Sequence, residues 1–201
     1  MPTFFQRIVA GVVHALLKLR LVDHYFGHVV RIDLLHRGSD RDLILIGRLG
    51  QLWMLILERS PISDEGLVHL KALTSMERLG LALTKVGDGG LVHLGGLTGL
   101  RRLAFSDNPI TDEGLVHLKG LTDLEILILD GTRVSGSGLA QLKGLKRLFR
   151  LSLTRTAVDD AGLKHLREMT RLKELFLGDT RVTDDGVREL QEALPNLKIS
   201  R

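Results

Sequence analysis

The sequence contains no cysteine and few aromatic residues, with one Trp, one Tyr and six Phe among 201 residues. The absence of cysteine excludes a disulfide-stabilised fold, thiol catalysis and cysteine-ligated zinc. The low aromatic content leaves too few stacking groups for a protein that binds single-stranded nucleic acid. Because disulfides are rare in reducing compartments, a chain without cysteine is expected in the cytoplasm.

The sequence also lacks a strong charge imbalance and a long apolar run. Its formal net charge is +4, with 26% charged and 44% hydrophobic residues, which is typical of an ordinary soluble protein. The apolar run at residues 8–17 is too short and has too many flanking charges to span a bilayer. A length of 201 residues allows one domain and little else.

A 24-residue repeat occupies most of the chain. Its pattern is L-x-x-L-x-L-x-x-[TSN]-x-[VI]-x-D-x-G-[LV]-x-x-L-x-x-[LM], and the six copies begin at Leu52, Met76, Leu100, Leu124, Leu148 and Leu172. Glycine fills the fifteenth position of every copy, at Gly66, Gly90, Gly114, Gly138, Gly162 and Gly186. A period of this length predicts a solenoid of stacked copies.

Two spacings within each copy predict one strand and one short helix. Apolar residues alternate at the start, as in Leu55 and Leu57, which indicates a strand with one buried face. Twelve residues later the spacing becomes three, as in Leu67, Leu70 and Leu73, which indicates a short helix lying on the strand. No copy can bury these leucines alone, so the copies must stack with their strands in register.

The stack is expected to bend, because strands pack about 4.8 Å apart whereas helices need roughly 8–10 Å. With these features the sequence resembles the leucine-rich repeat proteins. In particular, it resembles the 24-residue bacterial class with T-x-V-T-D-x-G-L, which is similar to ribonuclease-inhibitor-like and F-box-type repeats. The resemblance implies a right-handed α/β solenoid with a parallel β-sheet on its concave face, short helices on its convex face, and a binding role.

The regions outside the six copies (residues 52–195) are predicted to close the ends of the stack. Residues 29–51 match a degenerate first repeat, and residues 196–201 an edge strand without a following helix. Residues 1–28 carry an apolar stripe at i, i+4 spacing, for which three interpretations stay open. They predict a helix that caps the core, a cationic amphipathic helix that lies on a membrane through residues 4–21, or a signal peptide.

Three rows of polar residues recur at fixed repeat positions and are predicted to be structural. The histidine row lies on helix flanks too far apart to share a metal ion: His69, His93, His117 and His165. The carboxylate row is expected to complement helix dipoles without any partner: Asp64, Asp88, Asp112, Asp160 and Asp184. In the fourth copy Gly136 replaces the aspartate without harming the repeat pattern. The third row is expected to bond to loop amides of the neighbouring copy: Ser60, Thr84, Asn108, Thr132, Thr156 and Thr180.

No pattern in the sequence indicates catalysis. Phosphate-loop and nucleotide-binding fingerprints are absent, and no Ser, His and Asp grouping stands apart from the repeat rows. Arginines of the repeats are interleaved with acidic residues, so no single-sign stripe forms for a nucleic acid. We therefore expect a protein that is not an enzyme, uses no metal or cofactor, and does not bind nucleic acid.

Strand positions that packing does not fix are the candidate binding residues. The third, fifth and seventh positions of each copy face away from the core and vary in chemistry. The predicted contact residues on this concave face are Met54, Ile56, Glu58, Arg78, Arg102, Ile126, Ile128, Asp130, Arg150, Glu174 and Phe176. An apolar patch ringed by charges is typical of a protein-binding surface. The hypothesis is a non-catalytic protein–protein interaction scaffold; the alternative is a membrane-peripheral protein that displays the repeats from its N-terminal helix.

Overall fold

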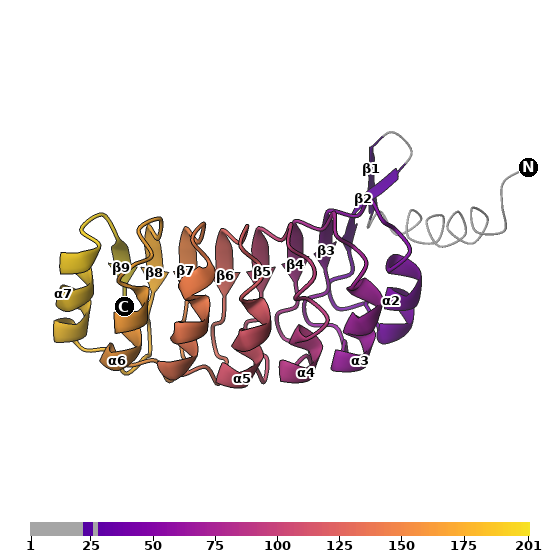
Figure 1. Ribbon diagram of the computed structural model, residues 1–201. Coiled ribbons are helices and arrows are strands. Elements are labelled where there is room, and N and C mark those ends of the chain that lie inside the picture. Colours follow the sequence, from indigo (N-terminus) through magenta and orange to yellow (C-terminus); the bar gives the residue numbers. More distant parts are fainter. Residues whose placement is uncertain (1–21, 26–27) are drawn as a thin grey trace, which may run out of the picture.

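The computed structural model describes residues 22–25 and 28–201, and their side chains from residue 31 onward. Figure 1 shows the repeats as a row, with the strands along one side and the helices along the other. The helices spread over a wider span than the strands, so the sheet lies on the inner side of the bend (Figure 1). This confirms the predicted leucine-rich repeat solenoid with a concave sheet.

The strands form one nine-stranded sheet in sequence order. β1 pairs antiparallel with β2, and the eight strands from β2 to β9 are parallel. The strands are β1 (Val22–Tyr25), β2 (His28–Asp33), β3 (Met54–Ile56), β4 (Arg78–Gly80), β5 (Arg102–Ala104), β6 (Ile126–Ile128), β7 (Arg150–Ser152), β8 (Glu174–Phe176) and β9 (Lys198–Ser200).

Each strand from β2 to β8 is followed by a short helical segment. These segments are α2 (Asp40–Ile46), α3 (Asp64–Leu67) with η1 (Val68–Leu70), α4 (Asp88–Leu91), α5 (Asp112–Leu115) with η2 (Val116–Leu118), η3 (Ser137–Gly144), α6 (Asp160–Leu163) with η4 (Lys164–Leu166), and α7 (Asp184–Ala193). The η segments are 3₁₀ helices, so several copies contain one α-helical turn that tightens into 3₁₀ geometry. Such compact units fit a 24-residue period.

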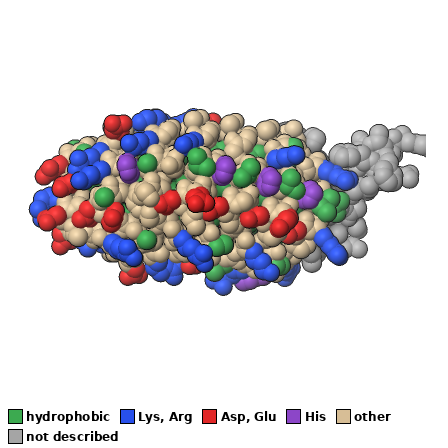
Figure 2. All heavy atoms as spheres, turned by 60° about the horizontal axis from the view of Figure 1, so that its bottom comes forward, with side chains coloured by type: hydrophobic (Ala, Val, Ile, Leu, Met, Phe, Trp, Pro, Cys, Tyr) green, Lys and Arg blue, Asp and Glu red, His purple; other side chains and the backbone are tan. Residues whose placement is uncertain are grey.

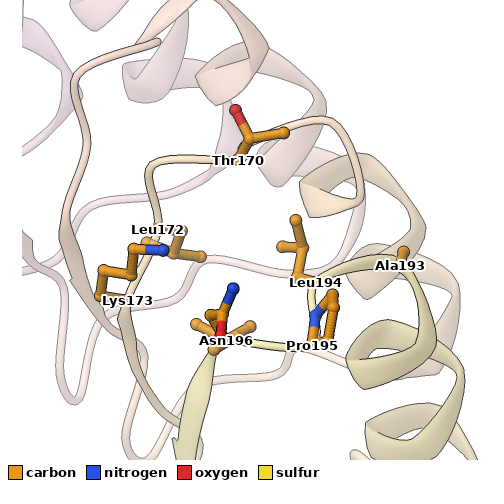
Figure 3. Close-up of a pocket in the computed structure, with 8 residues that line it drawn as sticks. Thr170, Leu172, Lys173, Ala193, Leu194, Pro195 and Asn196 are labelled. Carbon is orange, nitrogen blue, oxygen red and sulfur yellow. The ribbon is translucent and has the colours of Figure 1, made fainter.

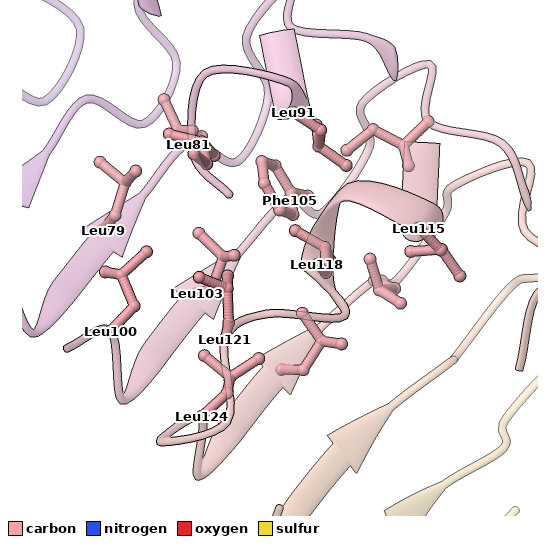
Figure 4. Close-up of a cluster of buried hydrophobic side chains, with 14 of the residues drawn as sticks. Leu79, Leu81, Leu91, Leu100, Leu103, Phe105, Leu115, Leu118, Leu121 and Leu124 are labelled. Atoms are coloured by element: carbon pink, nitrogen blue, oxygen red, sulfur yellow. The ribbon is translucent and has the colours of Figure 1, made fainter. Parts of the chain in front are cut away.

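The core is a continuous column of leucines between the sheet and the helices. Figure 4 shows Leu79 and Leu103 from neighbouring strands facing Leu91, Leu115 and Leu118, which come from the helical segments. All five side chains are at most 1% exposed. Burying one leucine contributes about 1.5–3 kcal/mol. Because the leucines of each copy are covered partly by the neighbouring copies, the stack is stable only as a whole.

The fourth copy differs from its neighbours, because its helical segment η3 is entirely 3₁₀. The prediction that Gly136 replaces aspartate without harming the repeat pattern agrees with the buried Leu139 and Leu142, but this copy has no α-helical turn. Glycine gives the first turn no carboxylate to complement the free amides and the greatest backbone freedom, and both effects weaken α-helix initiation.

The N-terminal prediction is corrected at one point. Residues 22–25 form β1 and not part of a helix over residues 1–28. This segment contains Val22 and Tyr25, which favour strands, and it pairs with β2. Residues 1–21, with the predicted apolar stripe, lie outside the described residues. Within the described part of the chain, no helix is both long and apolar enough to cross a membrane.

Both ends of the described stack carry elements beyond the six copies. Ile32, Leu43 and Ile46 of residues 29–51 are buried, and β2 pairs in register with β3. At the other end, β9 pairs with β8 after α7. The Arg201 guanidinium donates to the Val182 carbonyl and to the Asp184 carboxylate, which ties the last residue to the final loop.

Candidate protein-binding face

The parallel register arranges the predicted contact residues in rows across the concave face. The third-position row crosses the sheet in the order Arg31, Met54, Arg78, Arg102, Ile126, Arg150, Glu174 and Lys198. The fifth-position row follows as Asp33, Ile56, Gly80, Ala104, Ile128, Ser152, Phe176 and Ser200. Side chains in one row are therefore neighbours at the strand spacing of about 4.8 Å.

A hollow of about 330 Å³ lies in the N-terminal half of this face. Its floor includes Gly80 and Ala104, which lie between Ile56 and Ile128 in the register row. The Ile56 side chain and the Glu58 carboxylate lie over Gly80, since a Cβ there would be 3.1 Å from Ile56 Cδ1 and 3.0 Å from Glu58 Oε1. Both isoleucines are half-buried. The remaining lining residues are Met54, Glu58, Arg78, Leu79, Ala82, Arg102 and Ser106.

Two arginines stand side by side at one end of the hollow. Arg78 and Arg102 are register partners on β4 and β5, and both are exposed. The Arg78 guanidinium lies over the Trp53 ring, 5.3 Å from its centroid, so the ring restricts its position. Within residues 31–201, neither guanidinium has a carboxylate partner. These charges are available to a ligand.

The C-terminal half of the face satisfies its own charges. The Arg150 guanidinium donates to the Glu174 carboxylate and lies 6.0 Å from the centroid of the Phe176 ring. Asp130 accepts a bond from the Thr154 amide at 3.0 Å and another from the Ser152 hydroxyl. The predicted contact residues thus form two groups, an open hollow with free cations and a cluster of paired side chains around Arg150.

Sequence reasoning missed the small residues that create the hollow and the tryptophan that orients Arg78. Gly80 and Ala104 occupy the fifth position of adjacent copies, whereas the copies on both sides carry isoleucine there. That contrast is visible in the sequence, because a small residue between two larger ones in a register row leaves a gap. Trp53 gave no comparable signal, since its position precedes the strand.

The carboxylate row, predicted to act without any partner, joins each copy to the next. The Asp88 carboxylate accepts bonds from the Thr111 amide at 2.9 Å and the Thr111 hydroxyl at 2.6 Å. Asp112 accepts the same two bonds from Ser135, at 2.7 Å and 2.6 Å. We call these bonds, made by Asp40, Asp64, Asp88, Asp112 and Asp160 to the following copy, the aspartate staples.

Two staple carboxylates have a lowered pKa. Burial raises the pKa of Asp112, but donors from Ser135, Ser137 and Gly138 outweigh that effect and hold it below the ordinary value. The Thr183 amide and hydroxyl lower the pKa of Asp160, and the positive charge of Arg201 adds to their effect. The folded state therefore favours the ionised carboxylate of both groups over the protonated acid.

The staples explain the glycine at the fifteenth position of every copy. A Cβ placed on Gly114 would lie 2.3 Å from an Asp88 carboxylate oxygen, and one on Gly186 would lie 2.1 Å from Asp160. Gly162 is required for another reason, because the residue that faces it in the preceding copy, Gly136, has no carboxylate. A Cβ placed on Gly162 would lie 2.4 Å from the Gly136 Cα. Close approach between neighbouring copies therefore excludes any side chain.

The third polar row behaves as predicted at two positions only. Ser60 accepts a bond from the Gly38 amide, and Asn108 accepts one from the Thr84 amide, in each case from the preceding copy. The threonines instead donate to a carbonyl three residues earlier in their own copy, as the Thr132 hydroxyl does to Leu129 at 2.6 Å. The threonine hydroxyls therefore bond within their own copy, whereas Ser60 and Asn108 reach the preceding one.

The histidine row lies on the helix-bearing side of the molecule. Figure 2 shows histidine side chains recurring along one face, among mixed basic and acidic groups. His93, His117 and His165 are half-buried and His69 is exposed. In the described part of the chain, no three His, Cys, Asp or Glu side chains gather closely enough to hold a metal ion.

A smaller hollow of about 190 Å³ lies near the C-terminal end. In Figure 3, Thr170, Leu172 and Lys173, which precede β8, lie opposite the turn from α7 to β9 that contains Pro195 and Asn196. Its walls are largely loop residues without a charged cluster, so it offers fewer directed contacts than the concave hollow.

Comparison with known proteins supports the repeat fold. Residues 97–118 match the family described as Leucine Rich repeat. No curated protein matches the chain in sequence. Internalin C2 from Listeria monocytogenes is similar in structure, with a TM-score of 0.64 and 21% identity over 96% of this chain and 92% of that protein.

Two further structures are similar over most of this chain. The internalin inlF from Listeria monocytogenes has a TM-score of 0.59 and 19% identity, over 100% of this chain and 71% of that one. The structure of PEPR1-AtPEP1 has a TM-score of 0.63 and 18% identity, covering 89% of this chain and 25% of that one. The chain therefore has a leucine-rich repeat fold, structurally similar to that of the Listeria internalins.

Proposed function

We propose that this protein is a non-catalytic scaffold that binds another protein through the concave face of its solenoid. The observation that carries the proposal is the hollow between Ile56 and Ile128, with Arg78 and Arg102 beside it. A solvated surface needs neither an open apolar recess nor neighbouring cations without counter-charges. Protein-binding surfaces combine such an apolar centre with a charged rim.

Interaction energy on such a surface is expected to concentrate in a few large side chains. Ile128 belongs to the hollow, and Phe176 is the large aromatic residue of the cluster around Arg150. Both are half-buried and make no hydrogen bonds through their side chains, so their loss affects a ligand more than the fold. Leucine-rich repeat structures such as the internalins and PEPR1-AtPEP1 share the scaffold, and this supports a binding role without identifying a partner.

The test is affinity capture followed by mass spectrometry with the intact chain and two double variants. Ile128→Ala with Phe176→Ala alters the concave face, and Val92→Ala with Val116→Ala is the matched control on exposed helix-side residues. We expect the concave variant to lose the captured protein and the control to retain it, with nearly unchanged thermal unfolding for both. Early unfolding of the concave variant, or equal capture by both, contradicts the proposal.

The membrane-peripheral alternative depends on residues 4–21, which lie outside the described residues. No feature of the described part favours it over the scaffold. Co-sedimentation of the intact chain with anionic and neutral lipid vesicles separates the two: binding only to anionic vesicles, unaffected by the concave variant, supports the membrane role.

A further inference from the structure

We infer that the concave hollow receives an apolar side chain of a peptide segment whose nearby aspartate or glutamate binds Arg78 and Arg102. This inference rests on the proposed scaffold function and names the chemical class of the partner. The hollow supplies the apolar contact, and the arginine pair supplies the charge complement.

The hollow is large enough for a bulky apolar side chain. Its volume of about 330 Å³ is at the lower end of the range of roughly 300–1,000 Å³ for small-molecule sites. The walls include Ile56 and Ile128, and the floor includes Gly80 and Ala104, so an entering side chain meets these carbon atoms together with the polar groups of Glu58, Arg78, Arg102 and Ser106. A leucine, methionine or phenylalanine fits this description.

The arginine pair calls for a negative group at the edge of the hollow. The two arginines come from strands about 5 Å apart, and their like charges repel each other. Elsewhere on the same face, Arg150 is relieved of such repulsion by Glu174, whereas Arg78 and Arg102 form no ion pair with any carboxylate of residues 31–201. The Arg78 guanidinium lies over the Trp53 ring. A cation–π contact does not depend on a hydrogen bond, so the guanidinium can also donate its N–H groups to a carboxylate.

The charge balance of the face favours a single carboxylate over a polyanion. The basic residues Arg78, Arg102 and Arg150 share the face with Glu58, Asp130 and Glu174. Glu58 lines the end of the hollow opposite the arginines, where it opposes a second negative charge and favours an amide or basic group. A nucleic acid or polyphosphate would meet repulsion there.

The geometry also limits the spacing within the ligand. The arginines occupy the third strand position and the floor of the hollow the fifth, which are two residues apart on one face of the sheet. Two residues of extended chain cover about 6.6 Å. The acidic residue of the ligand is therefore expected within two residues of the apolar one.

The experiment is a selection from a random twelve-residue peptide library displayed on phage, using the intact chain as bait. We expect the selected peptides to carry Asp or Glu within two residues of a large apolar residue. The best peptide is then synthesised and its affinity measured by fluorescence anisotropy. Selection that yields no peptide, or peptides without this pair, overturns the inference.

Three variants test the two halves of the contact. Arg78→Glu with Arg102→Glu is expected to weaken the peptide by about 10- to 100-fold, and a peptide with Lys in place of its acidic residue should recover binding to that variant. Ala104→Leu fills the hollow and should abolish binding while both arginines remain, whereas Ala72→Leu at an exposed helix-side position is the control.

The outcomes separate this inference from the proposed function. If capture of a protein partner is lost in the Ile128→Ala, Phe176→Ala variant but survives both the charge reversal and Ala104→Leu, the scaffold function stands and the assignment of the hollow is wrong. Binding of a thymidine oligonucleotide in competition with the peptide also contradicts the inference, because a polyanion would then be the better ligand.

Discussion

At the scale of single residues, the repeat is held together by a carboxylate on one copy and the absence of a side chain on the next. The Asp88 Oδ1 atom occupies the space in which a Cβ of Gly114 would lie, and the same atom accepts the hydrogen bond from the Thr111 amide. The aspartate and the glycine are therefore one structural unit, although they lie 26 positions apart in the sequence.

We predict that Asp88→Ala lowers the free energy of unfolding by about 1–3 kcal/mol, because it leaves the Thr111 amide without its charged acceptor. The matched control is Asp123→Ala, which removes an exposed ion pair with Arg147 and should cost at most about 1 kcal/mol. Urea unfolding of both variants measures the difference. Equal losses contradict the special role of the staple.

The pairing with glycine is tested by a double-mutant cycle. Gly114→Ala should be strongly destabilising when Asp88 is present, since the added methyl group overlaps its carboxylate. In the Asp88→Ala background the same change should cost less, so the two losses should not add. Additive losses would mean that Gly114 is required for another reason.

The third residue after each strand from β2 to β8 adopts a left-handed backbone conformation, beginning with His36 at φ 63°. This position holds Arg59, Leu83, Asp107, Arg155 and Asp179 at φ between 55° and 58°, and Gly131 at 66°. Leu83 is the least suited of these residues, because it is bulky, 41% exposed and gains no polar contact through its side chain.

We predict that Leu83→Gly is more stable than Leu83→Ala by about 1 kcal/mol, because glycine alone removes the cost of the left-handed conformation. The alanine variant is the control for loss of the leucine side chain. Differential scanning calorimetry of the two variants measures the effect. A lower melting temperature for glycine would show that the conformation is not strained.

At the scale of elements, the junction between the fourth and fifth copies is the irregular one. Gly136 offers no carboxylate to the fifth copy, and Asp159 replaces the hydroxyl residue of other copies and accepts the Gly162 amide of its own helix. The lost staple and the new cap therefore accompany each other, and they coincide with the 3₁₀ helix η3.

We predict that Gly136→Asp with Asp159→Thr destabilises the protein less than Gly136→Asp alone, since the second change removes the Asp159 carboxylate, whereas the close contact of a Cβ at position 136 with the Gly162 Cα, at 2.9 Å, remains. Gly136→Asp alone should destabilise, because a Cβ at this position would lie 2.5 Å from an Asp159 carboxylate oxygen. Thermal unfolding of both variants provides the measurement. The opposite order of stability contradicts this account.

The sequence predicted the repeating elements because each depends on residues within one copy. Alternating leucines specify the strands, and three-residue spacing specifies the helices whose leucines are buried. Contacts between copies were predicted less well from the sequence. Asp88 was expected to have no partner, and Thr132 was expected to bond to a loop amide of the neighbouring copy. Both errors arise because a pattern within one copy contains no information on the distance to the next.

The candidate site illustrates the same limit. The third and fifth strand positions were recognised as facing the concave side, so Ile56, Ile128 and Arg102 were named from the sequence. The hollow became evident only when the register placed Gly80 and Ala104 side by side. Likewise, pairing of Arg150 with Glu174 across two copies distinguishes it from Arg102, although all three occupy the same repeat position.

At the scale of the whole molecule, staples along the stack make stability depend on pH. The pKa of Asp112 and that of Asp160 are both lowered by their donors. A lowered pKa in the folded state contributes stability that is present above the unfolded value, about 3.9 for Asp. That stability is lost as the pH falls through the lowered folded values.

We therefore predict that the melting temperature falls as the pH is lowered below about 4. The variant Asp112→Asn with Asp160→Asn should start lower at pH 7 and depend less on pH, because neither side chain can release a proton. Melting curves between pH 7 and pH 2 measure both slopes. Parallel slopes would place the acid sensitivity in other groups.

In-register stacking also fixes the spacing of contact points for any extended ligand that crosses the strands. Recognition points on the protein recur at each strand, about every 4.8 Å, whereas an extended peptide advances about 3.3 Å per residue. The two series coincide after two strands and three residues, at close to 10 Å. Because successive side chains of an extended peptide point to opposite faces, only every second coincidence, after four strands and six residues, returns a side chain to the protein. The sequence motif of a segment lying across β3 to β8 should therefore carry a six-residue period.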